Sequence, residues 1–199
     1  MNAEEYDREF PHSIAMRLFI ATSFPEPVTR DLNERVSAIK RKLPPASWVR
    51  PETQHLTFAF LGEQDESLIG TLTPALEDRL REVGRFEAVL ARCGFFPNPR
   101  RARAGWIGLE PEQPFKDTAL AVRDVVTGNG IELDRADFRP HLTLMRMRDN
   151  WPPASIEMFE RALGGYRSAP FVVDTVTIYS SRLNPTGAVH TAVRTFALA

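Results

Sequence analysis

The chain has 199 residues, of which 43% are hydrophobic and 10% aromatic. This composition is ordinary for a globular protein and excludes a wholly disordered or collagen-like chain. The 25 Lys and Arg residues nearly cancel the 26 Asp and Glu residues, so the overall charge is not that of a protein that coats duplex nucleic acid. Any contact with nucleic acid is therefore expected to be local.

The single cysteine, Cys93, excludes an intramolecular disulfide and a zinc site built from several cysteines. No run reaches the roughly 18 apolar residues that a membrane span requires. The first residues, MNAEEYDREF, are acidic where a signal peptide is basic. We therefore expect a cytoplasmic protein with no membrane partner. Residues 1–15 differ from the rest and predict either a mobile tail or an upstream start, with Met16 as the true first residue.

Strands and helices are interspersed along the chain. The first strand is expected at 16–21, and apolar residues then recur every three to four positions from Val28 to Leu43, which predicts an amphipathic helix ended by two prolines. Further helices are predicted at 65–83, from 114 to the Gly128 breaker and at 153–163, and further strands at 55–62, 86–96, 104–109, 138–147, 171–180 and 189–197. Several strands form hairpin-like pairs, so this order predicts an α+β fold.

The strand at 55–62, HLTFAFLG, has two unlike faces. Successive side chains of a strand point to opposite sides. Strict alternation therefore predicts a polar face with His55, Thr57 and Ala59 and an apolar face with Leu56, Phe58 and Phe60. Taken alone, such a stretch is most often structural, because a histidine at a strand start is commonly hydrogen-bonded and threonine favours strands.

The tripeptide His-Leu-Thr returns at His141, a little under half the chain later, in HLTLMR. Each copy lies in a predicted strand whose other face is apolar, and a proline precedes each, Pro51 four residues before His55 and Pro140 immediately before His141. This recurrence predicts two similar lobes that each contribute one strand to a shared cleft. The cleft would then contain two imidazoles, from His55 and His141, and two hydroxyls, from Thr57 and Thr143.

Two histidines across a cleft suit a reaction that removes one proton and delivers another, because the pKa of imidazole lies near neutrality. Hydroxyl groups donate hydrogen bonds to phosphate oxygens, and in-line displacement at phosphorus needs a base on one side and an acid on the other. The pattern therefore predicts action on a reactive phosphoester without a metal. Zinc is the competing interpretation, but it usually requires three or four ligands, and neither motif has a second ligand at a typical spacing.

Four segments resemble the bacterial and archaeal RNA 2′,3′-cyclic phosphodiesterases of the 2H phosphoesterase superfamily, first named 2′-5′ RNA ligases. They are MRLFIA, WVRPETQHLTFAFLG, FRPHLTLMR and IYSSRLNPTGAVH, and the resemblance extends from Met16 nearly to the C-terminus. It implies that residues 16–199 form a single domain with a bilobal α+β fold. Two antiparallel-sheet lobes with outer helices would surround a central, positively charged cleft.

The resemblance also implies an activity, which is hydrolysis of the 2′,3′-cyclic phosphate at an RNA end to a 2′-phosphate by a monomer without a cofactor. His141 would be the general base that activates water, and His55 the general acid that protonates the departing 3′ oxygen. Thr57 and Thr143 would hold the phosphate oxygens. Arg146, which matches the arginine after the second family motif, would pair with the phosphate.

Two positions fit this pattern less simply. Strict alternation places Arg146 on the strand face opposite His141, so it reaches the cleft only if the strand twists, bulges or ends there; otherwise it is a solvated arginine. His190 occupies a position where the family usually has tyrosine, in an expected outer strand. We interpret His190, and His12 in the N-terminal segment, as structural or surface residues.

A basic cluster, Arg100, Arg101 and Arg103, precedes Trp106. These residue types can steer an RNA strand and stack a base, or they can form a solvated turn beside a core tryptophan. Three alternative functions stay open at this point. They are the reverse joining of RNA ends through a 2′-5′ bond, hydrolysis of a small cyclic phosphate on a nucleotide or sugar, and binding of RNA ends without catalysis.

Overall fold

The computed structural model describes residues 15–134, 136–185 and 187–199. The predictions for residues 1–14, including His12, lie outside the described residues. The first strand, β1, spans Ala15–Ser23 and begins one residue before its expected start. Ala15 therefore belongs to the strand, where it pairs with Asp65.

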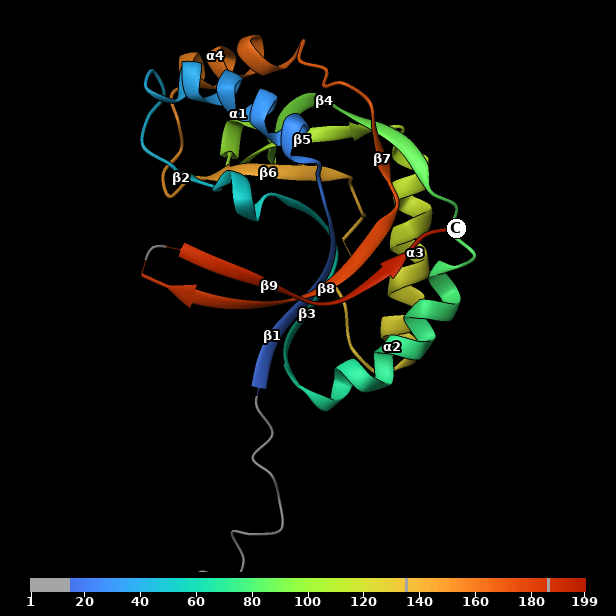
Figure 1. Ribbon diagram of the computed structural model, residues 1–199. Coiled ribbons are helices and arrows are strands. Elements are labelled where there is room, and N and C mark those ends of the chain that lie inside the picture. The colour runs from blue at the N-terminus through green and yellow to red at the C-terminus, as the bar shows by residue number, and fades with distance from the viewer. Residues whose placement is uncertain (1–14, 135, 186) are drawn as a thin grey trace, which may run out of the picture.

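Two antiparallel sheets form the framework (Figure 1). The four-stranded sheet has the order β3-β1-β8-β9, and the five-stranded sheet has the order β2-β6-β5-β4-β7. Their remaining strands are β2 (Ser47–Trp48), β3 (His55–Asp65), β4 (Phe86–Phe96), β5 (Ala104–Glu110), β6 (His141–Arg146), β7 (Phe171–Val173), β8 (Thr175–Asn184) and β9 (Gly187–Ala197). The two His-Leu-Thr motifs begin β3 and β6, so each lies in a different sheet, as the recurrence predicts.

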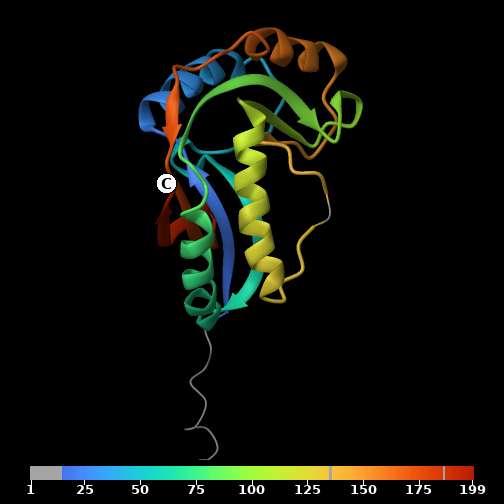
Figure 2. The same cartoon turned by 90° about the vertical axis from the view of Figure 1, so that its right-hand side faces the viewer.

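Four α-helices cover the outer faces of the sheets. Helices α1 (Glu26–Lys40) and α4 (Pro153–Leu163) lie together over the five-stranded sheet, whereas α2 (Ser67–Leu80) and α3 (Glu112–Gly128) lie side by side against the four-stranded sheet (Figures 1 and 2). Helix α1 follows a strand of the four-stranded sheet, and α3 follows a strand of the five-stranded sheet. The chain therefore crosses between the two lobes repeatedly, and buried residues of both lobes form one hydrophobic cluster.

The expected strand at 171–180 is in fact two strands. β7 pairs with β4 in the five-stranded sheet, and β8 pairs with β1 and β9 in the four-stranded sheet. The break falls at Asp174, whose carbonyl accepts a hydrogen bond from the N–H of Leu198 at 2.8 Å. Hydrophobic periodicity detects an extended segment, but it does not tell which sheet each half joins.

The face assignment within β3 is also corrected. β3 has two extra residues relative to β1, at Phe58 and Leu61, because Ala21 pairs with Thr57, Ile20 with Ala59, Phe19 with Phe60 and Leu18 with Gly62. Such bulges shift the alternation of the strand. Ala59 is therefore buried in the core, and Phe60 is 63% exposed instead of anchoring the strand. Leu56 and Phe58 are buried as predicted.

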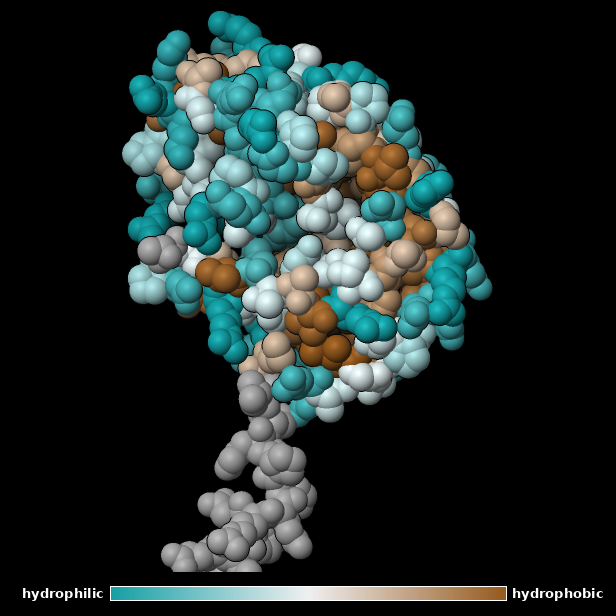
Figure 3. Space-filling view, in the orientation of Figure 1, coloured by the Kyte–Doolittle hydropathy of each residue, from teal (hydrophilic) through white to brown (hydrophobic). Residues whose placement is uncertain are grey.

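Large apolar side chains that reach the surface are scattered. Besides Phe60, exposed examples are Leu120 on α3 and Leu183 on β8, and the view in Figure 3 shows small, separate apolar areas within a mostly hydrophilic face. Isolated surface hydrophobes of this kind are normal in globular proteins. Among the described helices, none is long and apolar enough to cross a membrane.

Candidate active site

The two motif histidines have the same local geometry. The ring nitrogen Nδ1 of His55 lies 2.7 Å from the carbonyl oxygen of Thr53, and that of His141 lies 2.6 Å from the carbonyl oxygen of Arg139. A carbonyl can only accept, so each Nδ1 must carry the hydrogen and donate it. In the neutral imidazole this leaves Nε2 unprotonated, as the atom that exchanges a proton with a ligand.

Each histidine contacts an aromatic ring from another strand of the same sheet, Phe19 of β1 for His55 and Phe96 of β4 for His141. The ring centroids of Phe19 and His55 lie 4.8 Å apart, and those of Phe96 and His141 also lie 4.8 Å apart. Each imidazole is therefore held by a backbone carbonyl at Nδ1 and by an aromatic ring. The two histidines therefore have equivalent surroundings in the two lobes, so the repeat of the His-Leu-Thr motif is also a repeat of local structure.

The two threonines follow two residues after the histidines and are half-buried, like the histidines themselves. The leucine between each pair, Leu56 or Leu142, is 1% exposed and anchors its strand in the core. Each strand therefore presents an imidazole and a hydroxyl on one face and buries its other face, as alternation predicts for these residues.

Arg146 reaches the same face as His141 because β6 contains a bulge. Gly105 of β5 pairs with Met145, but the next residue, Trp106, pairs with Thr143, so Leu144 is the extra residue. Leu144 and Met145 are consecutive and both buried, and Arg146 returns to the exposed face. The positive charge of Arg146 lowers the pKa of both His55 and His141. The arginine thus lies near both histidines.

The histidines are neutral at neutral pH in the free protein. Burial above all, together with the charges of His190, His141 and Arg146, lowers the pKa of His55 from 6.5 to about 4, although the hydrogen bond to the carbonyl of Thr53 acts in the opposite direction. Burial, together with Arg146, also lowers the pKa of His141. Because the charge of His141 acts on His55, the two imidazoles lie in one electrostatic environment although they belong to different sheets. An anion placed between them would restore the charged form of either ring.

His190 is a third histidine beside this site, a contact that its interpretation as a structural or surface residue did not include. It lies on the outer strand β9, as expected, but its ring centroid is 5.2 Å from that of His55 and 4.9 Å from that of Phe19. Its Nδ1 is buried and has no hydrogen-bond partner among the described residues. No motif spacing predicts this contact, since it depends on the order β3-β1-β8-β9; the only signal is a histidine where the family usually has tyrosine.

The basic cluster lies on the surface. Arg100 and Arg101 are exposed in a short helical turn, η3 (Pro99–Arg101), whose N–H groups are capped by the side chain of Asn98. Arg103 donates a hydrogen bond to the carbonyl of Arg148. Trp106 is only half-buried, so it is not the core tryptophan of the structural interpretation. It lines a pocket that opens beside His141.

The side chains gathered at the site suit an anion. Two imidazoles, two hydroxyls and a guanidinium offer hydrogen bonds and positive charge to phosphate oxygens. Within the described ranges, no three His, Cys, Asp or Glu side chains lie together as a metal site would require.

Known proteins resemble this chain over most of its length. Residues 26–185 match the family model of the 2′-5′ RNA ligase superfamily. The RNA 2′,3′-cyclic phosphodiesterase of Methanothermobacter thermautotrophicus is 30% identical over 92% of this chain and 99% of its own length. The protein of the same name from Thermotoga maritima is 29% identical over 88% and 91% of the two chains.

The fold agrees with these matches. The crystal structure of TT0787 from Thermus thermophilus superposes with a TM-score of 0.76 at 27% identity and covers 92% of this chain and 98% of that one. The expected bilobal α+β fold is therefore confirmed. With its paired His-Leu-Thr strands in two antiparallel sheets, the chain belongs to the 2′-5′ RNA ligase superfamily.

Proposed function

We propose that this protein hydrolyses the 2′,3′-cyclic phosphate at the end of an RNA to a 2′-phosphate, without a metal ion. The observation that carries the proposal is the pair of histidines, one at the start of β3 and one at the start of β6, in matching settings and close enough that the charge of His141 lowers the pKa of His55. The names of the two relatives support the choice of substrate.

In the proposed reaction the phosphate lies between His55 and His141. Nε2 of His141 takes a proton from a water molecule as its oxygen bonds to phosphorus. The bond from phosphorus to the 3′ oxygen breaks on the opposite side, and His55 gives that oxygen a proton. The 2′ oxygen stays bonded to phosphorus, so the product carries a 2′-phosphate. General acid and base catalysis of this kind contributes typically about 100- to 10,000-fold for each group.

Three further side chains would stabilise the phosphate. Thr57 and Thr143 lie one on each strand, two residues after the histidines, and would donate hydrogen bonds to the non-bridging oxygens. Arg146, returned to this face by the bulge at Leu144, would pair with the negative charge that these oxygens carry. These interactions strengthen as the phosphorus becomes five-coordinate, because negative charge then accumulates on the oxygens.

The lowered pKa of His55 places a condition on this assignment. A proton donor must be charged when substrate is bound, yet His55 is neutral in the free protein at neutral pH. The bound phosphate would bring His55 to its charged form, because a nearby anion raises the pKa of an imidazole. A substrate in which sulfur replaces the bridging 3′ oxygen tests the two roles, since a thiolate leaves without protonation. His55→Ala should lose much less activity on the sulfur substrate than on the oxygen substrate, whereas His141→Ala should lose similar activity on both. The opposite pattern would exchange the roles.

The activity itself is tested with a 5′-labelled oligonucleotide that ends in a 2′,3′-cyclic phosphate, incubated with purified protein in EDTA. Hydrolysis to a 2′-phosphate is expected. An intact substrate, or a 3′-phosphate product, would refute the proposal. A parallel reaction with a second oligonucleotide that has a 5′-hydroxyl detects joining through a 2′-5′ bond, and a mononucleotide cyclic phosphate reveals whether the protein acts on small substrates.

A further inference from the structure

We propose that the pocket beside His141 binds the base of the terminal nucleoside, with Trp106 as the surface on which the base stacks. This inference rests on the proposed function, because it requires the phosphate of that nucleoside to lie at His141. The pocket has a volume of about 720 Å³, within the range of small-molecule sites. His141 is part of its wall, so the pocket is continuous with the candidate active site.

Two glycines create the floor of the pocket. Trp106 pairs with Thr143 on one side and with Gly94 on the other, and Gly108 pairs with His141. All five lie on the same face of the sheet, because paired residues, and residues two apart on one strand, share a face. A Cβ atom at Gly94 would come within 2.5 Å of the indole of Trp106, and one at Gly108 within 2.9 Å of the carbonyl oxygen of Ala91. At position 94 only glycine leaves room for the indole to lie across these strands, whereas at position 108 the absence of a Cβ avoids the backbone of β4.

Phe96 contacts both His141 and Trp106, so it connects the candidate active site with the floor of the pocket. The ring of Phe96 lies 4.8 Å from that of His141 and 5.3 Å from that of Trp106, with an interplanar angle of 31° to the indole. Both aromatic side chains are half-buried. The indole N–H is covered and has no acceptor in the described part of the chain, so packing against glycine positions this ring. A flat aromatic surface next to a phosphate site is suited to a nucleobase, because every base has a π-face.

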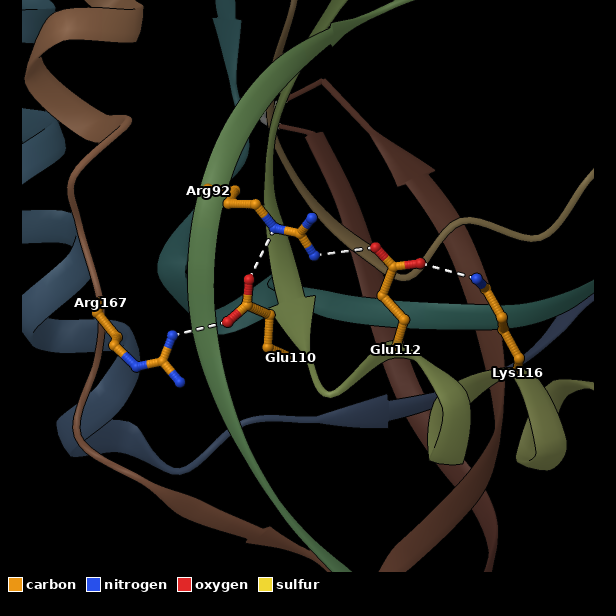
Figure 4. A network of polar contacts seen from close by, with 5 residues as sticks. All are labelled: Arg92, Glu110, Glu112, Lys116 and Arg167. Atoms are coloured by element: carbon orange, nitrogen blue, oxygen red, sulfur yellow. Dashed lines mark hydrogen bonds and ion pairs between the residues drawn. The ribbon is translucent and has the colours of Figure 1, made fainter.

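Three charged groups at the rim, Arg92, Glu112 and Lys116, are paired, whereas Arg139, which also lines the pocket, has no ion pair within the described ranges. Arg92 is the bulge residue of β4, with φ of 60°, and it contacts Glu110 at 2.8 Å and Glu112 at 2.9 Å. Lys116 contacts the other oxygen of Glu112 at 2.8 Å, and Arg167 contacts Glu110 at 2.7 Å (Figure 4). Each of these three cations is therefore already in an ion pair with a carboxylate. The pocket therefore offers a ligand its aromatic floor and the charge of Arg139.

The thiol in the pocket wall is also unsuited to chemistry. Burial raises the pKa of Cys93 to about 11, so this side chain is a neutral, weakly polar group at physiological pH. The pocket therefore has a binding character, and its reactive neighbour is His141.

The test compares kcat/KM for adenosine 2′,3′-cyclic phosphate and for methyl riboside 2′,3′-cyclic phosphate, which lacks the base. The wild-type protein should prefer the nucleoside by roughly 5- to 150-fold, the range that one stacked base provides. Trp106→Leu should remove most of this preference, and Gly94→Ala, which displaces the indole, should reduce it. Trp106→Phe, which keeps a ring, should retain part of it. An unchanged preference in Trp106→Leu would overturn the inference.

A matched control is available on the other face of the same sheet. Trp48 lies on β2 with the ammonium group of Lys40, at the end of α1, 5.6 Å from its ring centroid, so Trp48→Leu should keep the wild-type preference. Loss of preference in this control as well would show that general damage, not the missing indole, is responsible, and would count against the inference.

A binding measurement separates this inference from the proposed function. The chain has three tryptophans, so a Trp48→Phe, Trp151→Phe protein reports Trp106 fluorescence alone. Adenosine 2′-monophosphate should change this fluorescence, and inorganic phosphate at the same concentration should not. If no cyclic phosphate is hydrolysed but the nucleotide changes the signal, the proposed function fails and the base site stands. If hydrolysis occurs and the nucleotide leaves the signal unchanged, the base site fails alone.

Discussion

The lowered pKa of His55 predicts a specific loss of stability in acid. The folded protein holds this histidine with a pKa of about 4, against 6.5 for an unperturbed side chain, so the unfolded chain takes up the proton first as the pH falls. The stabilising contribution is complete above pH 6.5 and is lost between 6.5 and 4. The difference between the folded and unfolded pKa values lowers the free energy of unfolding by about 2.5 kcal/mol at about pH 4.5 from this residue alone.

The substitution His55→Gln removes the titrating group and serves as the comparison. Urea unfolding of both proteins at about pH 7 and about pH 4.5 gives four free energies of unfolding. The wild type should lose about 2.5 kcal/mol more than His55→Gln over this interval. His141 and His190, whose pKa values are also lowered, titrate in both proteins, so their effects largely cancel in the difference. Equal losses in the two proteins, within about 0.5 kcal/mol, would refute the claim that His55 is shielded from water.

Three other substitutions test the role of Arg146, the contact of His190 with His55 and the packing of the core. Arg146→Ala should lower kcat/KM for the cyclic-phosphate oligonucleotide by roughly 10- to 150-fold, the value of a charged hydrogen bond, while the exposed neighbour variant Arg148→Ala should match the wild type; equal effects would remove Arg146 from the site. His190→Phe keeps an aromatic ring but removes a neighbouring charge, so the pKa of His55 in an NMR titration should rise, and an unchanged or lower pKa would contradict the contact. Phe159→Ala deletes a ring that is 0% exposed and should lower the free energy of unfolding by about 3–5 kcal/mol in urea, whereas a loss below about 1 kcal/mol would show that the core is not packed as described.

Much of the fold follows from local pattern. The ranges expected for β4 and α4 match the structure, because turn residues bound the strand and because Ile156, Phe159 and Leu163 recur at helical spacing and are buried. The division of 171–180 between two sheets could not be predicted in this way. It depends on long-range pairing with β4 on one side and β1 on the other, and residue periodicity is blind to the identity of the partner strand.

In the candidate site, too, some residues could be predicted from the local sequence pattern and others could not. His55, Thr57, His141 and Thr143 are found by recurrence, since a repeated motif at equivalent positions of two lobes carries more information than either copy alone. Arg146 could be placed only conditionally, because its face depends on whether β6 contains a bulge, which the sequence does not mark.

The neighbours of the histidines were missed for a related reason. His190, Phe19 and Phe96 reach the site across strands that are distant in sequence, so only the strand order and register reveal them. Phe60 was expected in the core, but two bulges in β3 that the sequence does not mark place it on the surface.

The proposed reaction requires His55 and His141 to act together on one phosphate. The decisive measurement is kcat/KM for the 2′,3′-cyclic-phosphate oligonucleotide in EDTA, for the wild type, His55→Ala and His141→Ala. Each variant should lose at least about 100-fold, while its affinity for adenosine 2′-monophosphate should change far less. Activity within about tenfold of the wild type in either variant would contradict the claim, because a residue that donates or accepts the transferred proton cannot be removed at so small a cost.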